Sequence, residues 1–178
     1  MFVHYYQQHH LPIHLHHHNQ QHLFYQKAKA DKEELVIDKW FAIQASADAK
    51  GSLGRVKQLM QHEAFTTTNP NRVRSLVTTF ARGNPAGFHA ADGSGYAFTA
   101  EQVIALDKIN PQVAARLAGA FSQWRRYTAD RRSMMKGSPR THFSHMSHPT
   151  SSQISPCILV FQGHLEAIAA TDGLSEDT

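Results

Sequence analysis

The chain has 178 residues, 41% of them hydrophobic and 18% charged, and its formal net charge at pH 7 is +4. This length suits one ordinary domain rather than two. Cys157 is the single cysteine, which excludes an intrachain disulfide and a cysteine-based zinc site and favours a reducing compartment such as the cytoplasm. No run approaches the roughly 18 apolar residues of a membrane helix, so we expect no membrane contact.

Residues 1–24 form a head rich in His and Gln, which contains more than half of the 14 histidines. A tract this biased has little apolar surface to bury, so we predict that it is disordered. Neutral imidazoles bind zinc, copper and nickel, but a run of adjacent histidines fixes no coordination geometry. A metal buffer is therefore the least favoured interpretation of the chain.

The first helices are predicted between residues 31 and 82. Asp31 and Glu34 stand at capping-box spacing ahead of a broadly apolar helix. Ser52 is placed to start a second helix, which ends before residues 66–68, and a third runs over residues 69–82. The residues expected on the buried faces of the second and third helices are Leu53, Val56, Leu59, Met60, Val73, Leu76, Val77 and Phe80.

The second half of the chain continues the helical pattern. Residues 92–95 are predicted to form a tight turn between helices, since no strand precedes them and no Lys-Ser/Thr follows, as a phosphate-binding loop would require. A helix is expected over residues 101–109. The helix after Asn110 should be the longest, and Asp130 should cap a short basic continuation to Met135. The residues expected to be buried in it are Val113, Leu117, Phe121 and Trp124.

One helix opening occurs twice, at Asn69-Pro70 and, about 40 residues later, at Asn110-Pro111. Asn accepts hydrogen bonds from free amides at a helix start, and Pro suits the first helical position. Both openings are followed by a Leu and a Phe one turn apart. We therefore predict an all-α fold, a HEAT/ARM-like antiparallel helical-repeat superhelix with disordered ends, the second end being the Ser/Thr/Pro/His-rich tail over residues 138–178.

The sequence contains no complete catalytic motif. His62-Glu63 begins an H-E-x-x-H zinc motif, but Thr66 stands where the second histidine is needed. There is no G-x-S-x-G elbow, and Cys157 lies in the tail without a base to activate it. Between head and tail the only histidines are His62 and His89. We predict no catalytic residue and no metal ligand in this chain.

Between residues 25 and 137, several segments in order resemble the C-terminal helical domain of the bacterial-type alanyl aminopeptidases, the aminopeptidase N family of gluzincin zinc metallopeptidases. They include 38–45 (DKWFAIQA), 69–76 (NPNRVRSL), 84–89 (NPAGFH), 92–96 (DGSGY), 110–114 (NPQVA) and 125–127 (RRY). The resemblance ends near residue 137, so we interpret the chain as a fragment. Without the remaining cap, apolar surface near Phe121 and Trp124 would be exposed.

The resemblance implies a role in binding rather than in bond cleavage. In that family the zinc, the general-base glutamate and the transition-state tyrosine belong to an upstream catalytic domain, so this chain needs no cofactor itself. The helical domain walls the peptide-substrate cavity, which makes the catalytic domain and the peptide its expected partners. Arg74, Gln112 and Arg116 match residues that reach the cavity, and the last two lie one helical turn apart.

A second interpretation belongs to a different class of protein. Between Arg125 and Arg140 the basic residues outnumber the single acid, Asp130. Such a segment on a free-standing helical-repeat module would bind an acidic protein or nucleic acid. A solvated helix end explains the same charges, so nucleic acid is the less favoured partner.

Overall fold

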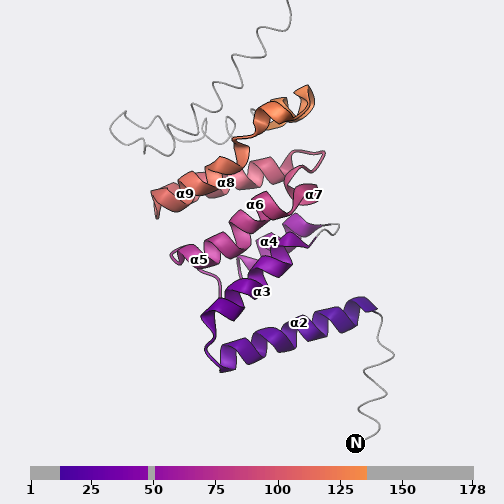
Figure 1. Ribbon diagram of the computed structural model, residues 1–178, viewed down its shortest axis with the longest axis vertical. Helices are drawn as coiled ribbons and strands as arrows, with labels where there is room; N and C mark the ends of the chain where they lie inside the picture. The colour runs from indigo at the N-terminus through magenta and orange to yellow at the C-terminus, as the bar shows by residue number, and fades with distance from the viewer. Residues whose placement is uncertain (1–12, 48–50, 136–178) are drawn as a thin grey trace, which may run out of the picture.

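The computed structural model describes residues 13–47 and 51–135, and these residues form helices and turns without any strand. Figure 1 shows the helices stacked in one row, from α2 at one end to α9 and a last helix over residues 129–135 at the other. The predicted all-α class is confirmed. The elements are α2 (Ile13–Ala30), α3 (Glu34–Ser46), α4 (Ser52–Leu59), α5 (Pro70–Val73), the π-helical turn η1 (Arg74–Thr78), α6 (Thr79–Gly83), α7 (Pro85–Phe88), α8 (Ser94–Asp107), α9 (Pro111–Ala118) and the 3-10 turns η2 (Gly119–Phe121) and η3 (Trp124–Arg126).

The helix α2 begins at Ile13, so residues 13–24 are helical where the sequence predicted disorder. Its C-terminal half packs on α3 through Tyr25 and Ala28, which are 2% and 3% exposed. Trp40 donates its indole N–H to the carbonyl of Gln21 at 3.1 Å. Tertiary packing of this kind stabilises a helix whose own amphipathic pattern is weak. Residues 1–12 and the predicted tail lie outside the described residues.

The start of α3 differs from the predicted capping box. Glu33 occupies the N-cap position and makes no side-chain cap bond. The backbone N–H of Asp31 instead donates to Lys27 at 2.9 Å, so Asp31 belongs to the end of α2. Lys32, with φ of 55°, turns the chain between the two helices.

The predicted helix over residues 69–82 is present as one continuous run of α5, η1 and α6. Asn69 accepts from the amide of Asn71 at 2.9 Å, which confirms its predicted capping role. In the middle, the Thr79 hydroxyl donates to the Arg74 carbonyl, five residues earlier, at 3.1 Å, alongside the wider π turn. The predicted core residues Val73, Leu76, Val77 and Phe80 are all buried.

The helix α8 begins at Ser94 rather than near residue 101. Gly93, with φ of 72°, takes the left-handed conformation just before it. Gly95 lies within the helix and touches another backbone: a Cβ there would lie 2.3 Å from the Gly87 carbonyl oxygen. Gly93 therefore lies in the predicted turn, whereas Gly95 permits a close approach between α7 and α8.

The prediction that the helix after Asn110 is the longest was wrong. The helix α9 has 8 residues, against 18 in α2, because the chain tightens into η2 after Ala118. Leu117 and Phe121 are buried as predicted, whereas Val113 is only partly buried. Asp130 lies inside the helix over residues 129–135 and does not cap it.

Two buried polar residues, Arg72 and Asn84, connect helices that are not adjacent in sequence. The sequence did not predict this role for either residue. Arg72 forms ion pairs with Glu34 and Asp38, joining α5 to α3. Asn84 donates to the carbonyls of Ala45 and Ala47 at 2.9 and 3.0 Å, joining the start of α7 to the end of α3. Among the described helices, none is long and apolar enough to cross a membrane.

Candidate functional site

The three predicted substrate-binding residues lie on two adjacent elements. Arg74 opens η1, and Gln112 and Arg116 are on α9, which packs against η1. All three side chains are exposed. Arg74 donates to the side chain of Asn71 at 3.0 Å, so its guanidinium is held along its own helix. Within the described part of the chain, no hydrogen bond or ion pair joins the three to one another.

The register of α9 separates a packed face from a polar one. Asn110 accepts from the amide of Val113 at 3.2 Å and sets the start of the helix. From that start, Gln112 and Arg116 fall one turn apart on the exposed side. The opposite, buried face consists of Ala114, Leu117 and Ala118.

Arg82 fixes the end of the same helix, a contact that no sequence signal indicated. Its Nη2 atom donates to the backbone carbonyl of Arg116 at 2.9 Å. A Cβ on Gly119 would lie 2.8 Å from that nitrogen, so the absence of a side chain there leaves space for the guanidinium. The contact joins α6 to the last turn of α9, which carries Arg116.

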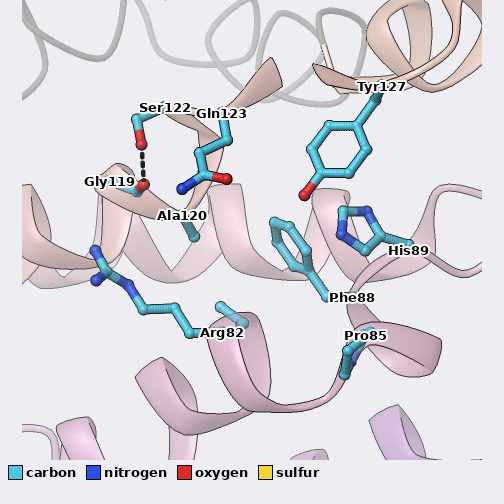
Figure 2. Close-up of a pocket in the computed structure, with 10 residues that line it drawn as sticks. Arg82, Pro85, Phe88, His89, Gly119, Ala120, Ser122, Gln123 and Tyr127 are labelled. Carbon is cyan, nitrogen blue, oxygen red and sulfur yellow. Dashed lines mark hydrogen bonds between the residues drawn. The ribbon is translucent and has the colours of Figure 1, made fainter. Parts of the chain in front are cut away.

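Beside Arg82 lies a pocket of about 600 Å³ (Figure 2). Its floor comes from α6 and α7, and its other side from η2 and the chain that follows. Such a volume is within the range of small-molecule sites. The residues that line it are Ala81, Arg82, Pro85, Phe88, His89, Gly119, Ala120, Ser122, Gln123 and Tyr127.

His89, at the edge of this pocket, is held in place by its neighbours. Its Nδ1 atom is 2.7 Å from the Tyr96 hydroxyl, and its backbone carbonyl accepts from Arg131 at 2.6 Å. Its ring centroid is 4.5 Å from that of Tyr127. Burial lowers the pKa of His89, and the charge of Arg131 lowers it further, so the ring is neutral at pH 7.

His62 is likewise part of the packing. Its ring meets the ring of Tyr25 edge-on at 4.7 Å, and its Nδ1 accepts from the amide of Ala64 at 3.2 Å. Burial lowers the pKa of His62. The neighbouring Glu63 accepts from Lys29 at 2.6 Å and from Tyr25 at 3.0 Å.

These donors do not fit a catalytic zinc ion. The neutral His62 ring accepts at Nδ1, which leaves its proton on Nε2, the other possible ligand atom. Glu63 is engaged by Lys29 and Tyr25, and its pKa is lowered mainly by the hydrogen bond from Lys29. Over residues 13–47 and 51–135, no three His, Cys, Asp or Glu side chains are grouped so as to hold a metal ion.

The basic segment after Arg125 is partly used inside the fold. Arg126 donates to the side chain of Gln123 at 3.1 Å, and Arg131 is bonded to His89. Arg132 is only partly exposed, and its Nε atom is buried. Residues 136–140, which complete the basic segment, lie outside the described residues. The described arginines therefore do not form a uniform solvated patch.

Residues 10–140 match the family described as "Domain of unknown function (DUF3458_C) ARM repeats". The chain belongs to this family. The chain is also 50% identical over 102 residues to "Aminopeptidase N" of Escherichia coli strain K12, which covers 57% of this chain and 12% of that protein. It is 48% identical over 104 residues to "Aminopeptidase N" of Caulobacter vibrioides, with 58% and 12% covered.

A solved structure agrees with the sequence comparisons. The crystal structure of Legionella pneumophila aminopeptidase A in complex with aspartic acid matches 83% of this chain and 16% of its own chain, with a TM-score of 0.71 and 32% identity. The predicted resemblance to the C-terminal helical domain of aminopeptidase N is confirmed. This ARM-repeat chain spans about 12% of the length of the aminopeptidases that it matches.

Proposed function

We propose that this ARM-repeat domain forms one wall of the peptide-substrate cavity of a zinc-dependent alanyl aminopeptidase, without cleaving bonds itself. In this role Arg74, Gln112 and Arg116 contact the peptide beyond the bond that is cut. The partner is a zinc catalytic domain of the aminopeptidase type. The observation that carries the proposal is the polar, exposed face of α9, which bears Gln112 and Arg116. This face lies on a chain that is 50% identical to aminopeptidase N over 102 residues.

The chemistry of this face suits a peptide. A guanidinium presents a planar set of N–H donors that matches a carbonyl or a terminal carboxylate, and an amide both donates and accepts. Arg116 is anchored through its backbone by Arg82, so its side chain remains available above a fixed helix end. Bond cleavage is not expected of the chain alone, since no H-E-x-x-H motif is present in its sequence.

A chimera tests the proposed wall. The matching segment of the Escherichia coli aminopeptidase N is replaced by the corresponding residues of this chain, and hydrolysis of an alanine oligopeptide is compared between the chimera and its Arg116→Ala variant. Because the contact would be made in both ground and transition states, we expect KM to rise about tenfold with little change in kcat.

Arg55→Ala, on the exposed side of α4, is the matched control and should leave KM unchanged. Equal effects of the two substitutions, or a fall in kcat alone, would contradict the proposed contact. The chain by itself, with added zinc, should not hydrolyse an alanyl anilide. Chelator-sensitive turnover by the purified chain would overturn the assignment of catalysis to another domain.

The alternative, a free-standing basic module that binds nucleic acid or an acidic protein, is weakened because Arg131 is used inside the fold, where it donates to the backbone carbonyl of His89. A salt titration separates the two functions. Phosphate binding should weaken steeply with added salt, by about one released counterion for each neutralised phosphate. Tight, salt-sensitive binding of a DNA duplex at physiological salt would favour this alternative.

A further inference from the structure

The pocket beside Arg82 has two chemically different ends, and the difference defines what fits it. Arg82 lies at one end, and His89 and Tyr127 lie at the other, with Phe88 and Pro85 below (Figure 2). Within residues 13–47 and 51–135, the lining contains no acidic side chain and a single permanent cation. A ligand that satisfies both ends needs an anionic group and an apolar body.

The polar end contains two side chains that carry N–H donors, Arg82 and Gln123. Arg82 uses one N–H of Nη2 to hold the carbonyl of Arg116, which leaves further N–H donors on its guanidinium. Gln123 accepts from Arg126 through Oε1 at 3.1 Å, and this bond orients its amide. Its amide nitrogen is turned toward the side of the pocket on which Arg82 lies (Figure 2). A guanidinium and an amide N–H at the same end of a pocket are suited to a carboxylate.

At the other end, rings provide an apolar surface. Most of the accessible ring surface comes from His89 and Tyr127, which are half-buried, whereas Phe88 lines the pocket with a side chain only 3% exposed and its ring centroid 4.9 Å from that of His89. Tyr127 packs on His89 from the opposite element. The segment that carries Tyr127 is held against α7 by the bond from Arg131 to His89. This end therefore has the shape and chemistry to pack an aromatic side group.

We propose that this pocket binds an aromatic carboxylate, with the carboxylate on Arg82 and Gln123 and the ring against Phe88, His89 and Tyr127. Neither Gln112 nor Arg116 is among the residues that line this pocket, all of which belong to this chain. Two sources supply this chemistry, a free aromatic acid and a peptide that ends in an aromatic residue.

The test uses the purified full chain at about pH 7.5, well above the ordinary pKa of histidine, so that His89 is neutral. The probe is 3-phenylpropionate, titrated at constant ionic strength and followed by amide NMR shifts. We expect saturable shifts at Gly119, Gln123 and His89. The uncharged 3-phenylpropionamide, which has the same ring, should bind at least about tenfold more weakly, because it lacks the charge that strengthens the bonds to Arg82. Equal affinity of acid and amide, or no saturable binding, would overturn the proposal.

Two variants locate the carboxylate. Arg82→Met keeps an apolar stem and removes the charge, and we expect it to weaken binding about tenfold or more. Gln123→Leu removes the second proposed contact to the carboxylate and should weaken binding severalfold. Because Gln123 is exposed, this substitution removes no buried contact and should not destabilise the fold. Lys108→Met, the matched control, removes one exposed positive charge outside the pocket and should change affinity less than about twofold. If Lys108→Met and Gln123→Leu lower the affinity for 3-phenylpropionate equally, the proposed carboxylate site is wrong.

A second pair of probes distinguishes the sources. N-acetyl-Gly-Phe carries the carboxylate at a peptide end, and its C-terminal amide is the neutral counterpart. Tighter binding of this peptide acid than of 3-phenylpropionate identifies a peptide end as the ligand, whereas weaker binding identifies a free acid. These titrations need no aminopeptidase activity, so their failure leaves the proposed cavity wall unaffected.

Discussion

Arg72 and Asp38 form an ion pair that is largely shielded from water, with side chains 4% and 13% exposed. The same guanidinium pairs with Glu34, whose side chain is 71% exposed and therefore adds less. Arg72 also donates to the carbonyls of Ala64 and Glu34 at 3.0 and 3.1 Å. One side chain thus connects α3, the loop after α4 and the start of α5.

Replacing this residue, as Arg72→Leu, should destabilise the fold strongly. The substitution leaves Asp38 shielded without its cation and removes the donor to Ala64, so we expect a loss of about 3 kcal/mol in the free energy of unfolding. Urea denaturation followed by circular dichroism measures it. Arg74→Leu, two residues away and exposed, should change stability by less than about 0.5 kcal/mol. Similar losses for the two variants would contradict the shielded pair.

Substitution by alanine should change the unfolding free energy in opposite directions at Gly95 and at Gly54. In Gly95→Ala the new Cβ would lie 2.3 Å from the Gly87 oxygen and 2.5 Å from the Phe88 oxygen, both backbone atoms that cannot turn aside. We expect a loss of more than about 2 kcal/mol as α7 and α8 move apart.

Among the described residues, a Cβ on Gly54 in α4 would meet no atom within 4 Å apart from its chain neighbours and its own helix backbone. Gly54→Ala should therefore raise the unfolding free energy by up to about 1 kcal/mol through helix propensity alone. Thermal unfolding of both variants checks the signs. Stabilisation by Gly95→Ala would show that the close approach is absent.

Substitution of Asn84 should lower the unfolding free energy more than substitution of an exposed asparagine. It is fully buried, donates to two carbonyls at the end of α3 and accepts from the amide of Gly87 at 2.9 Å. Asn84→Leu leaves all these groups without a partner, and we expect a loss of about 2 to 4 kcal/mol by urea denaturation. Asn71→Leu, at an exposed position, should have little effect. An equal, small loss in both would show that water replaces the lost bonds.

The sequence predicted the parts of this fold that depend on local rules. The Asn-Pro openings at Asn69 and Asn110 have helical starts as expected, because their side chains satisfy free amides within three residues. The apolar face of residues 69–82 also follows from periodicity alone. These features need no knowledge of what packs against them.

Features that arise between elements were missed. In the first turns of α8, Gly95 meets the backbone of α7, and the buried role of Arg72 depends on carboxylates 34 and 38 residues earlier in the sequence. The pocket beside Arg82 likewise joins α6 and α7 to η2. Spacing along the chain does not encode such contacts, so a surface arginine and a buried one look alike in the sequence.

The unfolding free energy should fall as the pH is lowered through the ordinary range of histidine. Burial, aided by the charge of Arg131, lowers the pKa of His89 below its usual 6.5 in the folded state. Above pH 6.5 the His89 ring is neutral in both the folded and the unfolded state, so its contribution to the unfolding free energy is fully present. Below it the unfolded chain takes up the proton first, so the unfolded state gains stability until the pH passes the folded pKa.

The His89→Gln variant tests this linkage because glutamine does not titrate. Its urea midpoint should fall less than that of the parent chain between about pH 7.5 and pH 5.5, since one proton-binding difference has been removed. Burial raises the pKa of Tyr96, whose hydroxyl is 2.7 Å from the His89 Nδ1 atom, so this phenol stays protonated over the range. If the urea midpoint of His89→Gln falls with pH as much as that of the parent chain, the pKa of His89 is the same in the folded and unfolded states, and the prediction is wrong.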